Sequence, residues 1–346
     1  MYSIRRHLFF ILIVKTAYAL FAIFVFSRFT SLGDTQDYLD GEYIDRNNLA
    51  STAYLMSVIG SALGQWGGYI FSISLSSLGM CYLLRIAELP YRQMTVTMIL
   101  IMLPSFGVWT SIFSKEVFVL FSFCLSTAGL IDLYNQKRRF FSLAQWCGLA
   151  LLTFIKPHYA ASIYISMLAI MAYHTGFKRE LMLALMIIVL SMSCVLCFFY
   201  IDSIYYFTQI MPAHFSLAGG STRLNTFWQD EWDFFTYLPI GATVAFIGPT
   251  FPEAISSPKL LPFFIEGCFL LGLILSYGWG SVVYQKKVNV LGLCLMMTFA
   301  LTLMLTHYPF GLFNPGSAVR YRSGFIFPLC VFVLFLSVKN RPLKSG

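Results

Sequence analysis

Long apolar runs recur along the whole chain, and they constrain its fold more than any other feature of the sequence. About twenty apolar residues in succession are enough for a helix to cross a bilayer, and the runs read in this way predict about ten spans. Their approximate limits are 8–26, 66–86, 94–109, 117–134, 141–155, 159–173, 181–200, 261–284, 288–306 and 325–338. Hydrophobic residues make up 58% of the 346 residues and charged residues only 11%, which excludes a soluble globular domain. We therefore predict an all-α, polytopic transmembrane helical bundle that forms a single domain over residues 1–346.

The charged residues between the spans predict the orientation in the membrane. Fourteen of the 23 Lys and Arg residues fall in short segments on one side, among them Lys137-Arg138-Arg139, and an excess of these residues marks cytoplasmic loops. Both termini are therefore expected in the cytoplasm, and the two long polar segments, 28–65 and 201–260, outside it. Most Asp and Glu residues also fall on the exterior side, so this face is the one equipped for chemistry.

Several function classes find no support in the composition. The net charge of +8 comes from small basic clusters and not from a continuous stripe, so no nucleic-acid partner is expected. The eight cysteines lie in or beside apolar runs, which argues against a disulfide framework, and the pair Cys194 and Cys197 is interpreted as packing within a span. The chain also lacks a Walker A loop, a dinucleotide-binding glycine pattern and an H-E-x-x-H motif.

Local features modify this outline. Lys15 interrupts the first span, and we expect it to snorkel toward the inner face, because a charged group inside the bilayer is costly. Residues 49–63 repeat apolar side chains at helical spacing, which predicts a juxtamembrane helix before the second span. The segment 237–251 is rich in Gly and Pro and is expected to dip into the interface without crossing. The two short runs joined by Lys156-Pro157-His158 are expected to be helices that do not fully cross.

The exterior segment after the first span concentrates acidic residues. They are Asp34, Asp37, Asp40, Glu42 and Asp45. A positioned carboxylate is what general-base catalysis requires, and Asp34 is the candidate for that role. The alternative is an acidic loop that only interacts with solvent, and composition alone does not separate the two interpretations.

Basic side chains on the exterior side run against the topological charge rule. They lie at Lys115 beside Glu116, at Lys156 near His158, and in Arg320-Tyr321-Arg322. Lys and Arg are the side chains with which proteins bind phosphate, so one explanation is an anion held near the membrane. The other is that each residue reaches lipid headgroups or pairs with a loop acid, and for any single residue this is the simpler explanation.

The acidic segment resembles the first exterior loop of the GT-C superfamily of integral-membrane glycosyltransferases. In one branch of that superfamily the loop reads Asp-Glu-x-x-Tyr; here Asp34 and Tyr38 keep their places, while Thr35 replaces the Glu, so the second acid would be Asp37. The stretch from Pro104 to Glu116 and the Arg320-Tyr321-Arg322 stretch resemble features of bacterial GT-C-like and polysaccharide-polymerase-like proteins. The similar layout covers nearly the whole chain, although each motif is short.

The resemblance implies an inverting glycosyltransferase of the bacterial inner membrane, with its active face on the exterior or periplasmic side. It would move a sugar from a polyprenyl-phosphate-linked donor to a glycan acceptor in cell-envelope polysaccharide synthesis. The implied site has Asp34 and Asp37 as catalytic residues and Tyr38, Lys115, Glu116, Lys156, His158, Arg320, Tyr321 and Arg322 around the donor phosphate. Mg²⁺ or Mn²⁺ on Asp34 and Asp37 is compatible with this hypothesis, which requires neither.

Three other functions stay open from the sequence. An oligosaccharide repeat-unit polymerase would share the lipid-linked donor but transfer a whole glycan. A non-enzymatic transporter or flippase for a lipid-linked saccharide would also use basic groups, and it would place ionisable residues at mid-membrane on several helices, often in two similar halves. Lys15 is the residue of this kind that we identify, and the sequence shows no internal repeat. A purely structural membrane subunit is the third.

Overall fold

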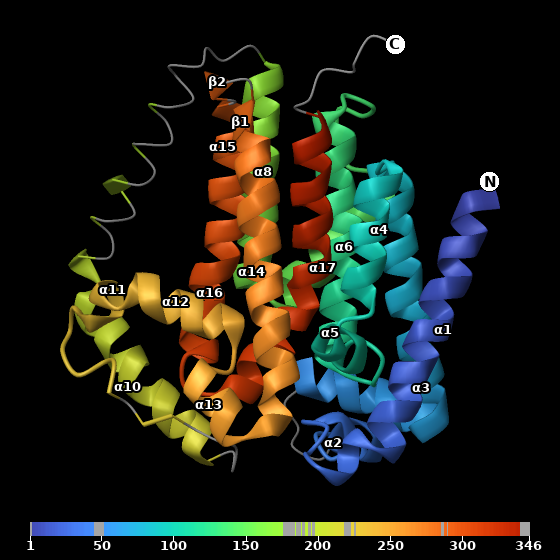
Figure 1. Cartoon of the computed structure of the whole chain (residues 1–346), viewed down its shortest axis with the longest axis vertical. Coiled ribbons are helices and arrows are strands. Elements are labelled where there is room, and N and C mark those ends of the chain that lie inside the picture. Colours follow the sequence, from blue (N-terminus) through green and yellow to red (C-terminus); the bar gives the residue numbers. More distant parts are fainter. Residues whose placement is uncertain are drawn as a thin grey trace. The chain divides into compact units, whose positions relative to one another are not determined.

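The computed structural model of the chain is built almost entirely of helices (Figure 1). It describes residues 2–44, 52–175, 198–217, 223–224, 226–284, 287–288 and 290–339, with isolated positions between 184 and 195. The chain divides into two compact units, Met1–Ile163 with Ser323–Phe335, and Tyr164–Arg322 with Leu336–Gly346. The long helix α17 (Pro315–Lys339) contributes residues to both units.

The first unit holds the helices of the N-terminal half. They are α1 (Tyr2–Phe24), the 3₁₀ turn η1 (Phe26–Arg28), α2 (Thr35–Asp40), α3 (Thr52–Ala87), α4 (Tyr91–Ile101), α5 (Pro104–Trp109), α6 (Lys115–Tyr134), α7 (Leu143–Ile155) and the start of α8 (Pro157–His174). Helix α6 is buried nearly all round, since α3 and α7 pack on it and Gly79 and Gly148 let their backbones approach Phe121 and Leu125. Such close approach at small residues is typical of helices that pack within membranes.

The second unit holds shorter elements as well as long helices. They are α10 (Ile201–Leu217), α11 (Asp233–Thr236), α12 (Leu238–Ile247), α13 (Phe251–Ser256), the 3₁₀ turn η2 (Pro258–Leu260), α14 (Leu261–Val282), α15 (Val290–Met296), the π-helical turn η3 (Met297–Leu301) and α16 (Thr302–Gly311). Strands β1 (Val283–Tyr284) and β2 (Lys287–Val288) have two residues each and pair antiparallel, with Val283 opposite Val288.

Seven segments in the described part of the chain are long and apolar enough to cross a membrane. They are Arg6–Arg28, Thr52–Ala87, Lys115–Tyr134, Leu238–Ser256, Pro258–Gly280, Val290–Gly311 and Pro315–Val338. The prediction of a helical bundle in a lipid bilayer is confirmed at this level, and the chain has the character of an integral membrane protein.

The structure differs from the predicted spans in the run 94–109. The run 94–109 is not one helix, because α4 ends at Ile101 and Pro104 begins α5, and proline lacks the N–H that would continue a helix. Helix α7 has 13 residues, which is too short to cross alone, and this agrees with the prediction for the first of the two short runs beside Lys156-Pro157-His158. The predicted span 181–200, with Cys194 and Cys197, lies largely outside the described residues.

A break at Gly64 separates the two parts of α3. Its φ of 66° and ψ of 178° are not helical, and glycine adopts a positive φ without the steric cost that other residues carry. The break falls between the juxtamembrane helix and the second span that the sequence predicts. In the first part, Gly60 lies so close to α2 that a Cβ there would be 2.3 Å from the carbonyl oxygen of Tyr38. Helix α2, which carries the acidic segment, is therefore fixed on α3 (Figure 1).

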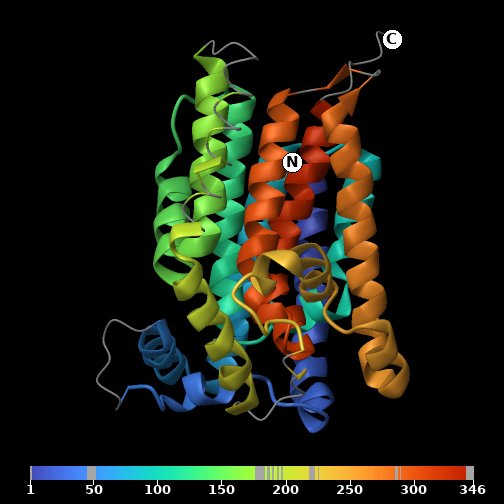
Figure 2. The ribbon, with the colours of Figure 1, turned by 90° about the vertical axis from the view of Figure 1, so that its left-hand side faces the viewer.

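Helix α12 is the short central helix of the second unit. Glycines let neighbouring helices approach it closely, since a Cβ on Gly241 of α12 would meet the Tyr308 ring at 2.3 Å. A Cβ on Gly267 of α14 would lie 2.2 Å from the Ile247 carbonyl oxygen of α12. Although Leu238–Ser256 is long enough to span, its helical geometry stops at Gly248, whose φ is 94°, and resumes in α13. Figure 2 shows α12 and α13, in yellow to orange, as short helices beside the long α14.

Candidate functional site

Asp34 and Tyr38 form the first part of the candidate site. Asp34 is the N-cap residue of α2 and follows Gly33, whose φ is 62°. Side chains four residues apart lie on the same face of a helix, and the Tyr38 hydroxyl donates a hydrogen bond of 3.1 Å to a carboxylate oxygen of Asp34. Tyr38 is 1% exposed, whereas Asp34 is half-buried. The Asp-x-x-x-Tyr spacing of the sequence thus corresponds to one direct contact.

Lys115 completes this group from a different helix. It is the first residue of α6, and its Nζ atom lies 5.5 Å from the centroid of the Tyr38 ring, a cation–π distance. The Tyr43 ring lies 5.7 Å from the same ring. The structure therefore brings Asp34, Tyr38 and Lys115 together, and we call these three residues the Asp34 cluster.

The other acids of the segment have different surroundings. Asp40 is exposed and accepts hydrogen bonds of 3.0 and 2.9 Å from the Gln36 amide. Asp37 is half-buried, and within the described residues its carboxylate makes no hydrogen bond or ion pair. Asp45 lies outside the described residues. No group of three or more His, Cys, Asp and Glu suited to a metal ion occurs in the described ranges, and the catalytic role of Asp37 stays a prediction.

Lys156 and His158 surround a buried aromatic residue at the junction of α7 and α8. Lys156 ends α7, and its Nζ atom lies 5.8 Å from the Tyr159 ring centroid. The His158 and Tyr159 rings are 4.5 Å apart. Burial, and secondly the charge of Lys156, lowers the pKa of His158 to about 4. The imidazole is therefore neutral near pH 7, where it can donate a hydrogen bond without carrying charge.

Helix α17 packs against the starts of both α6 and α8 within the first unit. A Cβ on Gly324 would lie 3.0 Å from Val119 and 3.8 Å from the carbonyl oxygen of Glu116, which is itself 3% exposed. The next residue, Phe325, places its ring 5.4 Å from that of Tyr159. The helix starts that carry Lys115 and Lys156 are therefore neighbours of the same turn of α17.

Lys15 does not snorkel, contrary to the expectation from the sequence. Its side chain is 0% exposed; Nζ donates a hydrogen bond to the Thr110 hydroxyl and lies 4.1 Å from the Phe106 ring centroid. Among the described residues no carboxylate forms an ion pair with it. Packing of α1 on α5 covers the amine before it can reach either interface, so a hydroxyl and an aromatic face replace water.

Arg320, Tyr321 and Arg322 belong to the second unit. Arg320 lies over the Tyr321 ring with its Cζ 5.9 Å from the centroid. Arg322 is 0% exposed; it donates hydrogen bonds to the carbonyl oxygens of Phe246 and Ile247, and another of 3.2 Å to Glu266. These contacts support a structural role for Arg322. The prediction that this stretch shares a phosphate with Asp34 stays a prediction.

Three charged residues of the second unit have partners that were not predicted from the sequence, namely Arg223, Glu253 and Glu266. Arg223 donates to both carboxylate oxygens of Glu253 at 2.7 and 2.6 Å and to the carbonyl oxygens of Gly248 and Leu312 at 2.6 Å each. Glu266 lies inside the predicted span 261–284, where a charge is costly unless it is paired. That position was the available sequence signal, and it indicated that Glu266 needs a basic partner without identifying Arg322.

Trp228 and Asp233, in the second segment that we predict to be exterior, have structural roles. Trp228 is fully buried and donates a hydrogen bond of 2.8 Å from its indole nitrogen to the Tyr308 hydroxyl. Asp233 accepts hydrogen bonds of 2.8 and 2.9 Å from the backbone N–H groups of Gln229 and Asp230. Asp233 therefore fixes the loop to which it belongs, and Trp228 anchors this loop to α16.

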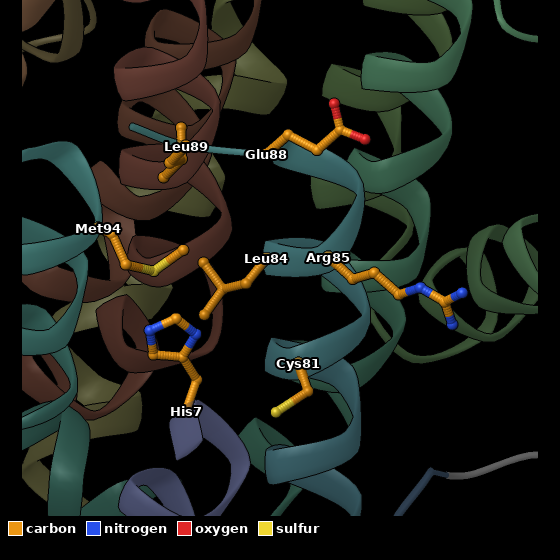
Figure 3. A pocket seen from close by; sticks show the side chains of 7 residues that line it. All are labelled: His7, Cys81, Leu84, Arg85, Glu88, Leu89 and Met94. Atoms are coloured by element: carbon orange, nitrogen blue, oxygen red, sulfur yellow. The ribbon is translucent and has the colours of Figure 1, made fainter. Parts of the chain in front are cut away.

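A small cavity of about 200 Å³ lies where α1, α3 and α4 meet, at the end that we predict to be cytoplasmic. Figure 3 shows the His7 ring facing Leu84 and Met94, while Arg85 of α3 and Glu88, which directly follows α3, project away from it. Glu88 forms an exposed ion pair of 3.0 Å with Lys137. The titratable groups at this end diverge, so the arrangement lacks the convergence of the Asp34 cluster.

Comparison of the chain with protein-family models, with curated proteins and with solved structures found no match. The resemblance to GT-C glycosyltransferases is therefore a hypothesis that rests on the residues themselves. What the structure shows of the motif is local: the Asp34 carboxylate and the Tyr38 hydroxyl contact each other, and Lys115 lies over the Tyr38 ring.

Proposed function

We propose that the protein is a membrane glycosyltransferase that moves a sugar from a polyprenyl-phosphate-linked donor to a glycan acceptor. The observation that carries this proposal is the Asp34 cluster. A carboxylate and an ammonium group share one buried tyrosine, at the start of two helices. Transfer away from a lipid phosphate requires a base and a cation near one another, and this pair of charged groups supports the proposal.

In the proposed reaction Asp34 accepts the proton of the acceptor hydroxyl. The acceptor oxygen forms a bond to the anomeric carbon while the bond from that carbon to the donor phosphate breaks, and the lipid phosphate leaves with the electron pair. The Tyr38 hydroxyl holds the Asp34 carboxylate in position through their hydrogen bond of 3.1 Å. Lys115 offsets the negative charge that grows on the leaving phosphate, and Lys156 lies on the neighbouring helix start.

We further propose the orientation that the charges predict, with about ten spans, both termini in the cytoplasm of a bacterium and the Asp34 cluster outside its inner membrane. On a cysteine-free background, a cysteine at the exposed position Gln36 should react with a membrane-impermeant thiol reagent added to intact cells. A cysteine at Lys137 should react only after the membrane is opened. The reverse pattern would place the cluster on the wrong face and exclude a lipid-linked donor displayed outside.

Lys115→Ala tests the site directly. Loss of a charge that contacts the leaving phosphate should lower transfer by roughly 30- to 1000-fold, which corresponds to about 2–4 kcal/mol. The measurement is glycan transfer in isolated membranes at matched protein levels, with kcat and KM for the lipid-linked donor determined separately. Lys137→Ala is the matched control, since Lys137 is paired with Glu88 at the other end of the helices. Equal activity in the two variants would remove Lys115 from the mechanism.

A transporter for a lipid-linked saccharide is the second candidate, and one observation favours it. Five of the candidate spans in the described chain carry a buried Asp, Glu, Lys, Arg or His side chain, as membrane transporters often do. These side chains are Lys15, Glu116, Asp132, Glu266, His307 and Arg322. The two functions differ in their products, because a transferase forms a new glycosidic bond whereas a transporter changes only the side on which the donor lies. Accumulation of unused donor on the exterior face of a deletion strain supports the transferase, and accumulation on the inner face supports the transporter. An oligosaccharide repeat-unit polymerase would follow the transferase pattern.

A further inference from the structure

A polar cavity of about 350 Å³ lies within the second unit. Its lining includes Arg223, Glu253, Ser257 and Lys259, with Leu260 and Pro315 as apolar walls. Pockets that bind small molecules start at about 300 Å³, so the cavity has room for a small ligand such as one sugar residue or one phosphate group. None of these residues belongs to the proposed transfer site.

The Arg223–Glu253 side of this cavity is rigid and electrically balanced. Arg223 uses all three guanidinium nitrogens on Glu253 and on carbonyl oxygens of Gly248 and Leu312, while Glu253 also accepts a hydrogen bond of 2.7 Å from the N–H of Thr250. Paired at 2.6 Å, the two opposite charges largely cancel. This wall is therefore built before any ligand binds, which lowers the entropic cost of binding.

Lys259 and Ser257 supply the polar groups that are not engaged. Lys259 is exposed and lies in the turn η2, directly before α14. Within the residues that the structure describes, neither its ammonium group nor the Ser257 hydroxyl has a hydrogen-bond or ion-pair partner. Since the Arg223–Glu253 pair is balanced, Lys259 determines the sign of the charge inside the cavity, which is positive.

We infer that this cavity binds an anionic oxygen group, a phosphate or a carboxylate, carried either by a saccharide or by a lipid headgroup. Lys259 supplies the charge and a charge-assisted hydrogen bond, the Ser257 hydroxyl a second donor, and Leu260 and Pro315 contact the apolar part of the ligand. The inference stands independently of the proposed transfer reaction, because it uses none of the residues of the Asp34 cluster.

The inference is tested by measuring how anionic and uncharged probes bind to the protein reconstituted in phosphatidylcholine nanodiscs. Radiolabelled glucose 1-phosphate and uncharged glucose serve as saccharide probes in equilibrium dialysis, and phosphatidylglycerol retained from mixed discs is counted by native mass spectrometry. At least one anionic probe should bind, and Lys259→Gln should weaken it roughly tenfold, as expected for loss of a charged hydrogen bond. Lys137→Gln is the matched control and should bind as the unchanged protein does.

The two kinds of anionic probe identify the source of the anion, and the variants separate this cavity from the Asp34 cluster. Loss of glucose 1-phosphate binding in Lys259→Gln assigns a saccharide, whereas loss of phosphatidylglycerol assigns a lipid headgroup. Binding that persists in Lys115→Ala and is lost in Lys259→Gln belongs to this cavity. The inference is overturned if neither anion binds, if glucose binds as tightly as glucose 1-phosphate, or if Lys259→Gln and Lys137→Gln behave alike.

Discussion

Asp34→Asn is expected to abolish glycosyl transfer while the protein stays folded and inserted in the membrane. Asn has the shape of Asp, and its amide oxygen can still accept the hydrogen bond of the Tyr38 hydroxyl, so the contact of 3.1 Å within α2 is retained. What is lost is the capacity to take a proton from the acceptor, and general-base catalysis contributes about 10² to 10⁴ in rate. The measurement is transfer in membranes at matched protein levels.

Asp40→Asn provides the comparison for this result. Asp40 lies on the same short helix, but it is exposed and contacts Gln36 instead of the cluster, so its substitution should leave transfer near the level of the unchanged protein. Full activity in Asp34→Asn would end the catalytic assignment. Similar partial losses at Asp34, Asp37 and Asp40 would instead indicate an acidic loop that acts through its overall charge.

The sequence was most informative where function depends on residues close together in the chain. The contact between Asp34 and Tyr38 could be anticipated, because positions four apart on a helix share a face, and the break near Gly64 could be anticipated from the change in hydropathy. The same reasoning identified Lys115 as a candidate, but it did not reveal the Tyr38 ring as its partner. The position of the Tyr38 ring depends on how α2 packs against α3. This packing requires the absence of a side chain at Gly60, and no local sequence pattern predicts that contact.

The basic residues show why the remainder could not be predicted. From the sequence, Lys15 was expected to reach water, yet it is covered by the packing of α1 on α5. Arg223 was not predicted to have a role. Its partners are carbonyl groups at helix ends, and such groups need donors only where a helix ends in the interior. Hydropathy located the apolar segment of α12, but not the break at Gly248 that creates this need.

Arg322→Met is expected to destabilise the protein by about 3–5 kcal/mol, the usual effect of breaking a buried ion pair. The substitution leaves the Glu266 carboxylate buried without its partner, and it removes the donor to the carbonyl oxygens of Phe246 and Ile247. Unfolding of the purified protein in detergent measures the loss. Arg320→Met is the control, since Arg320 is only half-buried, and its effect on stability should stay within about 0.5 kcal/mol.

A double variant separates the two contributions that Arg322 makes. Arg322→Met with Glu266→Leu removes both charges, so the uncompensated carboxylate disappears, and stability should recover in part relative to Arg322→Met alone. Recovery should not be complete, because the helix-end carbonyl oxygens still lack their donor, a deficit of about 1–3 kcal/mol. If Arg322→Met unfolds like the unchanged protein but has lost transfer, Arg322 contacts the substrate and the phosphate-binding role predicted from the sequence is the correct one. If stability falls and the double variant regains it only partly, Arg322 acts by closing the end of α12.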